Sequence, residues 1–266
     1  MENSRKGALS SPGTGYLGPV ETLFALTVAA AESSARSGLL ADLRTFGRLG
    51  VRGAGVVTAV GTESPEGFVL VHEIPAQAVR EQLRAARAAG PIRAAKVGFV
   101  TTVPVIRAAA AEVSRLGAPV VVDPALVTRS GTPLLRGSST GAFVRELLPA
   151  ATVITPNLPE ASLLAGFPVR NEDGAKRAAR AIQQLGPRAV LIKGGHAEGD
   201  EVADGLLDGR TWCTLRHPRL PVERPEGSGG LLSAAITAFL ARGETLPDAV
   251  AAALDFVHRE LAEWST

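Results

Sequence analysis

The chain has 266 residues, of which 45% are apolar, and its formal net charge is +2. We expect one large domain, because no charged or proline-rich linker interrupts the chain after its N-terminus, and the scattered arginines argue against nucleic-acid binding. The single cysteine, Cys213, excludes an intrachain disulfide and a cysteine-rich metal site, and no apolar run approaches the ~18 residues of a membrane span, so we expect a cytoplasmic protein.

The N-terminal part of the chain predicts an arm followed by the first strand and helix. Residues 1–20 are rich in glycine, serine and proline and predict a flexible arm, which leaves 21–266 as the expected domain. Residues 23–30 form a continuous apolar run, typical of a buried strand, and Ser33 and Ser34 are expected to cap a helix that extends to Leu49. A second strand is predicted over 56–60, and an edge strand over 69–74.

From residue 76 onward, helical and strand patterns alternate. The predicted helices cover 76–89, 103–116, 141–148 and 173–185, and the strands that follow them cover 94–100, 119–122, 152–155 and 189–192. The remaining predicted elements are a hairpin over 202–215 that turns at Asp208-Gly209 and helices over 228–240 and 246–263. This alternation indicates βαβ units, hence an α/β fold with a mostly parallel sheet and helices on both faces.

A glycine turn, Gly227-Ser228-Gly229-Gly230, leads directly into the apolar helix predicted near the C-terminus. Glycines allow a tight turn, and a helix start adds free N–H donors and the positive end of its dipole. The turn therefore predicts a site for an anion such as phosphate. The structural alternative is an ordinary loop before a core helix, with Ser228 as the N-cap.

Polar residues follow three of the predicted strands. Asp123 follows the first strand, Asn157 and Glu160 follow the second, and Lys193-Gly194 follows the third. Each could be a strand-end turn, but in parallel sheets ligands bind beyond the carboxyl ends of the strands. A lysine, two acids and a glycine-lined helix start suit phosphoryl transfer, which needs cations and N–H donors around the phosphates and acids to hold Mg²⁺.

Several motifs, in this order along the chain, resemble the hydroxymethylpyrimidine phosphate kinases of thiamine biosynthesis. The segments that carry the resemblance are ALTVAAAESSARSGLLADLRTFGRLGVRG (25–53), VVTAVGTES (56–64), DPALVTRSGTPLL (123–135), TPNLPEASLLAG (155–166), KGGHAEGDEVADGLLDG (193–209) and GSGGLLSAAITAFLARG (227–243). The resemblance covers nearly everything except the arm. It implies a ribokinase-like three-layer sandwich that uses ATP and Mg²⁺ to phosphorylate a pyrimidine alcohol or the phosphate already on it. Pyridoxal kinases share this fold, so pyridoxal is an alternative substrate.

The resemblance also implies roles for residues at matching positions. Those expected to bind substrate are Ala30, Glu32, Glu63 and Phe99, and those expected on the nucleotide side are Asn157, Lys193 and Gly194. Glu160 and Asp123 are expected near the metal, and Gly227, Ser228, Gly229 and Gly230 match the family's anion hole. His196 receives no catalytic role. The expected partners are ATP and a small alcohol, without nucleic acid or membrane, and a homodimer is left open.

The chain departs from the family at several of these positions. Gly230 stands where the family has the cysteine, or its relatives an aspartate, that is taken as the base for the substrate hydroxyl. Ala30 replaces a glycine, Glu32 an aspartate, Glu63 a glutamine and Phe99 a methionine. Two hypotheses follow.

The first hypothesis is a working kinase whose base comes from elsewhere, such as Glu226 or Glu32. The second is a non-catalytic ligand-binding or regulatory relative that keeps the fold. The expectation leans toward an ATP-dependent kinase, with its activity left open.

Overall fold

A computed structural model describes residues 24–64, 67–127, 134–135, 137–194, 200–220 and 227–263. The arm predicted over 1–20 lies outside these ranges. None of the described helices combines the length and apolar character that crossing a membrane requires.

One sheet contains all nine of the strands in the described ranges, in the order β3-β2-β1-β4-β5-β6-β7-β8-β9. The strands are β1 (Phe24–Glu32), β2 (Arg52–Ser64), β3 (Gly67–Glu73), β4 (Ile92–Val97), β5 (Val120–Val122), β6 (Val153–Ile154), β7 (Ala189–Ile192), β8 (Glu201–Asp208) and β9 (Thr211–Pro218). Six adjacent strands are parallel, in the order β2, β1, β4, β5, β6 and β7, whereas β3, β8 and β9 pair antiparallel to their neighbours. The carboxyl ends of the parallel strands therefore meet at one edge of the sheet.

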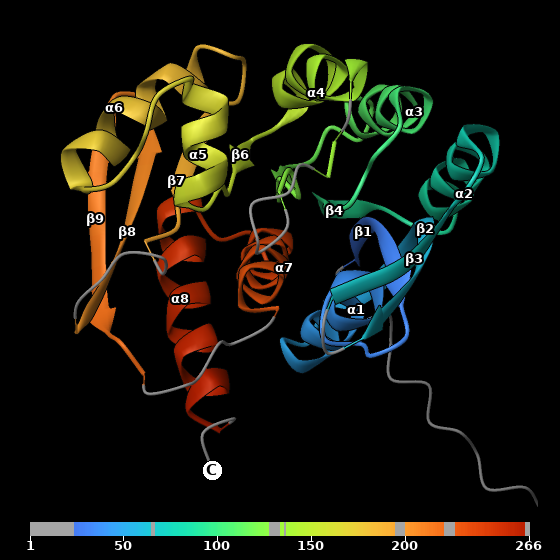
Figure 1. The fold of residues 1–266 in the computed structure, drawn as a ribbon. Coiled ribbons are helices and arrows are strands. Elements are labelled where there is room, and N and C mark those ends of the chain that lie inside the picture. The colour runs from blue at the N-terminus through green and yellow to red at the C-terminus, as the bar shows by residue number, and fades with distance from the viewer. Residues whose placement is uncertain are drawn as a thin grey trace, which may run out of the picture.

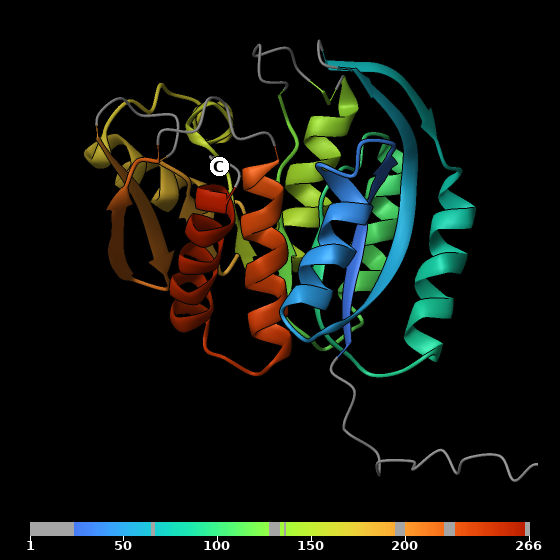
Figure 2. The ribbon, with the colours of Figure 1, turned by 90° about the horizontal axis from the view of Figure 1, so that it is seen from below.

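Helices cover both faces of this sheet, which confirms the predicted three-layer α/β sandwich (Figure 1). The helices are α1 (Gly38–Arg48), α2 (Ala76–Ala88), α3 (Val103–Val113), α4 (Ser138–Ala142), α5 (Leu158–Ala165), α6 (Glu172–Gln183), α7 (Ser228–Ala241) and α8 (Leu246–Glu263). One face carries α1, α7 and α8, and the other carries α2 to α6 (Figure 1). Figure 2 shows α8, α7 and α1 side by side along the sheet, as their mutual contacts require.

The strand pattern explains why both faces are covered. Val120 and Val122 of β5 point into the core shared with α2 to α6, whereas Val121 points into the core shared with α1, α7 and α8. All three side chains are buried. Strands that are apolar on both sides need a helical layer on each face, as the continuous apolar runs predicted.

Three local features differ from the expected elements. The first helix begins at Gly38 with Ser37 as its N-cap, not after Ser33 and Ser34. The physical reason is that the carboxylate of Glu32 accepts hydrogen bonds from the N–H groups of Ser34 (2.6 Å) and Ser37 (2.9 Å), which keeps this segment in a loop.

The other two differences lie in the second half of the chain. Helix α5 was not expected, because a proline-containing strand-end turn was the simpler interpretation of its sequence. The helix predicted over 141–148 begins earlier, at Ser138, and continues as a π-helical turn, Phe143–Leu147, and a 3-10 turn, Leu148–Ala150.

Candidate functional site

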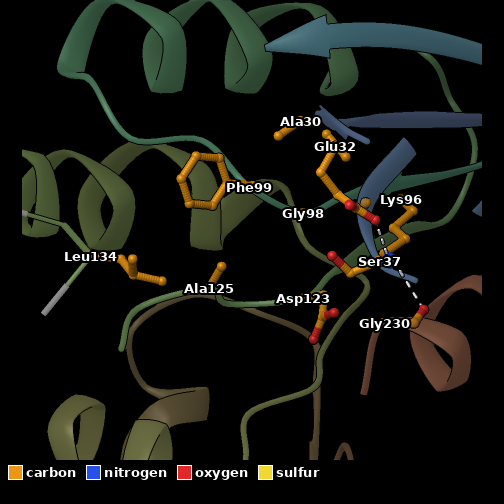
Figure 3. A pocket seen from close by; sticks show the side chains of 12 residues that line it. Ala30, Glu32, Ser37, Lys96, Gly98, Phe99, Asp123, Ala125, Leu134 and Gly230 are labelled. Atoms are coloured by element: carbon orange, nitrogen blue, oxygen red, sulfur yellow. Dashed lines mark hydrogen bonds between the residues drawn. The ribbon is translucent and has the colours of Figure 1, made fainter. Parts of the chain in front are cut away.

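A cavity of about 170 Å³ opens at the carboxyl edge of the sheet, beside the start of α7. In Figure 3, its apolar end is formed by Phe99, Leu134 and Ala125. The opposite end is polar and contains the side chains of Glu32, Ser37, Lys96 and Asp123 together with Gly230. Such a cavity suits a small ligand with one apolar and one polar end.

Asp123 lies at the polar end of the cavity, directly after β5. Its Oδ1 accepts hydrogen bonds from the ammonium of Lys193 (3.0 Å) and the hydroxyl of Thr155 (3.1 Å), and its Oδ2 accepts one from Ser233 (3.0 Å). Burial alone would raise the pKa of Asp123, but the charges of Lys193 and Lys96 and these hydrogen bonds hold it below its ordinary value. Asp123 is therefore a fixed anion in the site.

Lys193 directly follows β7 and links Asp123 to the start of α7. Burial would lower its pKa, but the carboxylates of Asp123 and Glu160 outweigh that effect and raise it. A Cβ added to Gly229 would lie 2.9 Å from Nζ of Lys193, so the absence of a side chain at Gly229 leaves room for the ammonium. The site thus holds a permanent cation next to a helix N-terminus.

Asn157 and Glu160 form a capping box at the start of α5. The Asn157 side chain accepts from the N–H of Glu160 (2.9 Å), and the Glu160 carboxylate accepts from the N–H of Asn157 (3.0 Å). Burial raises the pKa of Glu160 to about 7; Lys193 opposes this shift and Asp123 adds to it. When all three are ionised, Asp123 and Glu160 carry more negative charge than Lys193 carries positive charge. The space beside these two carboxylates therefore attracts a further cation.

The glycine turn before α7 is held by backbone geometry. Gly227 is the N-cap, with φ of 82°, and a Cβ there would collide with the carbonyl oxygen of Arg36. Ser228 is the first residue of the helix and not its N-cap, and no side chain caps this end. The suggestion that Ser228 caps the helix is therefore wrong. The first N–H groups of a helix have no intrahelical acceptors, so this end keeps donors and the positive dipole for an anion.

Lys96 lines the cavity, and it comes from β4 in the middle of the sheet. Its ammonium forms an ion pair with Asp42 of α1 and donates to the carbonyl oxygen of Gly230 (3.1 Å). The exposed fractions of the two side chains are only 2% for Lys96 and 1% for Asp42. Asp42 also accepts a hydrogen bond from Thr27. Burial raises the pKa of Asp42, because the charge of Lys96 offsets only part of the desolvation.

Comparison with known proteins identifies the family. The family model described as phosphomethylpyrimidine kinase matches residues 32–265. The chain belongs to this family. A hydroxymethylpyrimidine/phosphomethylpyrimidine kinase from Rhizobium meliloti (strain 1021) is 40% identical over 242 residues, which cover 91% of each chain. One from Streptomyces coelicolor is 40% identical over 239 residues, covering 90% of this chain and 88% of the relative.

Solved structures agree with this assignment. The phosphomethylpyrimidine kinase from Clostridium difficile 630 superposes with a TM-score of 0.79 at 32% identity, covering 89% of this chain and 98% of that one. The pyridoxal kinase from Staphylococcus aureus in complex with AMP-PCP superposes with a TM-score of 0.83 at 33% identity, covering 90% and 87%. The predicted family and the ribokinase-like fold are confirmed.

The structure brings five of the thirteen family-matched residues to the wall of one cavity. Ala30, Glu32, Phe99, Asp123 and Gly230 all line the cavity. Their roles toward a ligand stay predictions.

The other expected residues do not line the cavity, or their side chains lie outside the described part of the chain. Asn157 uses its side chain as a helix cap, and the N–H of Gly194 donates to Asp204 (2.7 Å). Glu63 lies on β2, but its side chain is outside the described part of the chain, as are His196 and Glu226.

Sequence reasoning missed three buried polar residues that organise the site: Lys96, Asp42 and Asp204. Each is at most 3% exposed. A signal was present for Lys96, because it is the one ionisable side chain inside the otherwise apolar stretch 94–100. A lysine at such a position needs a buried acid as partner, although the sequence does not say which acid that is.

Proposed function

We propose that this chain is an ATP-dependent kinase that phosphorylates the hydroxymethyl group of a pyrimidine, or the phosphate already on it. The observation that carries the proposal is a cluster beside the cavity: Lys193 pairs with Asp123 and lies next to Gly229 at the start of α7, and Asp123 and Gly230 line the cavity itself. Phosphoryl transfer is achieved mainly by positioning and by electrostatic stabilisation, and this arrangement provides a fixed cation and helix donors for phosphate groups.

On the nucleotide side, the phosphates of ATP would bind between Lys193 and the N–H groups at Gly227–Gly230. Lys193 keeps its charge because Asp123 and Glu160 raise its pKa. The staphylococcal pyridoxal kinase that resembles this chain has been solved with the ATP analogue AMP-PCP, which supports nucleotide binding here.

The residues near this site also fit Mg²⁺. Within the described ranges, no three His, Cys, Asp or Glu side chains gather closely enough to hold a metal alone. Mg²⁺ in kinases nevertheless needs only one or two carboxylates, because nucleotide phosphates and water complete its shell. The raised pKa of Glu160 marks a buried carboxylate whose charge is not fully compensated. Glu160 and Asp123 would hold the ion, which would supply positive charge beside the phosphates.

The substrate ring would lie against Phe99 at the apolar end, with its hydroxymethyl group at the polar end. The alcohol oxygen bonds to the γ-phosphorus while the bond from phosphorus to the β-phosphate oxygen breaks and ADP leaves. The hydroxyl proton goes to an oxygen of the new phosphate ester. Pyridoxal remains an alternative substrate, supported by the likeness to pyridoxal kinases.

One observation favours a second candidate, a ligand-binding relative without catalysis: Gly230 offers no side chain that could act as a base. A positioned base contributes about 10²- to 10⁴-fold, so its loss slows a kinase without removing ATP binding.

Nucleotide binding and turnover measured together test the proposal. We expect AMP-PCP with Mg²⁺ to raise the melting temperature, because a ligand at 100 times its Kd stabilises by about 2.7 kcal/mol. We also expect ADP release that depends on hydroxymethylpyrimidine or pyridoxal. Lys193→Met should abolish both effects, and Lys176→Met on α6 is the control that should keep both. A thermal shift without turnover would favour the non-catalytic candidate, and the absence of both would refute the proposal.

A further inference from the structure

The polar end of the cavity contains Lys96, whose ammonium has one N–H group without an acceptor among the residues that the structure describes. The Lys96 ammonium has three N–H groups. Among the residues that the structure describes, it donates to the carboxylate of Asp42 and to the carbonyl of Gly230. One N–H therefore remains, and Lys96 belongs to the cavity wall.

Stability alone does not explain this buried pair. Burying two charges costs free energy that their attraction repays only in part, and apolar residues of similar volume often serve a core as well or better. The strand positions around Lys96 are apolar and buried, including Ala95 and Val97. Asp42 therefore neutralises the charge of Lys96, and the position of Lys96 in the cavity wall needs a reason other than stability.

The space beside Lys96 is open because residue 230 is glycine. A Cβ at Gly230 would find Nζ of Lys96 as its nearest neighbour, at 3.7 Å. Figure 3 shows the Lys96 side chain reaching to Gly230 across the polar end, opposite Phe99 and Leu134. A ligand with its ring at the apolar end thus directs its polar substituent toward the ammonium and the start of α7.

We propose that Lys96 is a substrate-contacting residue, whose remaining N–H donates to the oxygen of the hydroxymethyl group that is to be phosphorylated. This inference rests on the proposed function. The donor fixes the alcohol oxygen between Lys96 and the helix N-terminus, where phosphate groups would lie. Because Gly230 supplies no base, the site assists the acceptor oxygen by holding it in this orientation.

Binding of two ligands by calorimetry tests this role: hydroxymethylpyrimidine, and the same pyrimidine with a methyl group in place of the hydroxymethyl group. We expect the wild type to prefer the alcohol by on the order of 10- to 100-fold, the usual value of a hydrogen bond to a charged donor. The variant is Asp42→Asn with Lys96→Met, which leaves no buried charge unpaired. It should bind both ligands alike while its affinity for the methyl compound stays unchanged. A purely structural role for Lys96 would instead weaken both ligands equally.

The control variant is Lys176→Met, which should keep the preference for the alcohol. Equal binding of the two ligands by the wild type would overturn the inference, as would a double variant that keeps the preference. Equal binding by the wild type can be measured without any variant, so the proposal can be refuted even if the double variant does not fold. Turnover distinguishes the role of Lys96 from the proposed function. If the wild type phosphorylates the alcohol but shows no binding preference for it, only the role of Lys96 is refuted. A wild type that neither binds nor phosphorylates it refutes the proposed function, and the inference with it.

Discussion

Replacing Gly230 by cysteine should raise the kinase activity of this chain toward hydroxymethylpyrimidine. Gly230 lies in the first turn of α7, and its φ is not in the left-handed region. A side chain therefore causes no backbone strain, and the nearest atom to the new Cβ would be Nζ of Lys96 at 3.7 Å. Gly230→Cys and Gly230→Asp are both expected to fold.

The magnitude follows from two effects. The helix start and the Lys96 ammonium both stabilise a negative charge, so they favour the thiolate or carboxylate that can accept the hydroxyl proton. General base catalysis is worth about 10²- to 10⁴-fold, which is the upper limit of the gain. A substrate misplaced by Ala30 or Phe99 reduces it, because poor placement alone can cost about 10²-fold.

The assay is alcohol-dependent ADP release by wild type, Gly230→Cys, Gly230→Asp and Gly230→Ala, after melting curves have shown that all four are folded. Gly230→Ala is the matched control, since it adds the Cβ and helix propensity without a base, and it should not gain activity. If the cysteine and aspartate variants fold but release ADP no faster than the alanine variant, residue 230 is not the position at which a base would act.

Three further predictions concern stability and the phosphate side of the site. Ala35 has a φ of 55°, so Ala35→Gly should raise the melting temperature by relieving up to about 1 kcal/mol of strain; an unchanged or lower value contradicts this. Glu160 has a folded pKa of about 7 against an ordinary 4.5, so its proton binds more tightly to the folded state. Denaturant titrations should show that the wild type, compared with Glu160→Gln, loses up to about 3 kcal/mol as pH rises from about 4 to about 8. A constant difference would mean that Glu160 is ionised in the folded protein throughout. A Cβ at Gly194 would collide with backbone of β8, so Gly194→Ala should unfold at lower temperature and weaken ATP binding, whereas Gly47→Ala, which has open space, should do neither.

The order and type of most elements could be predicted from the sequence, because continuous apolar runs identify buried strands and helical spacing identifies the segments between them. The start of α1 could not, since it depends on a carboxylate of Glu32 that holds the loop amides of Ser34 and Ser37. Serines are good N-caps in isolation, but a competing local hydrogen bond moved the helix start to Gly38.

The edge of the sheet where the site lies could also be predicted, because Asp123 and Lys193 each follow a strand that the pattern identifies as parallel. The partners of these residues could not. Asp42 and Lys96 are far apart in sequence and lie on a helix and a strand whose relative rotation only the folded structure fixes. The N-x-x-E spacing of Asn157 and Glu160 is also the spacing of a capping box, so the pattern alone did not separate a phosphate site from a helix start.

Transfer of a radiolabelled γ-phosphate from ATP to hydroxymethylpyrimidine by the purified wild-type chain tests the central claim most directly. The account predicts a labelled pyrimidine phosphate that forms in equal amount to ADP, needs Mg²⁺ and disappears in Lys193→Met while Lys176→Met still makes it. If the folded wild type binds AMP-PCP yet transfers no label to hydroxymethylpyrimidine, its phosphate or pyridoxal, the chain is not a kinase of these alcohols.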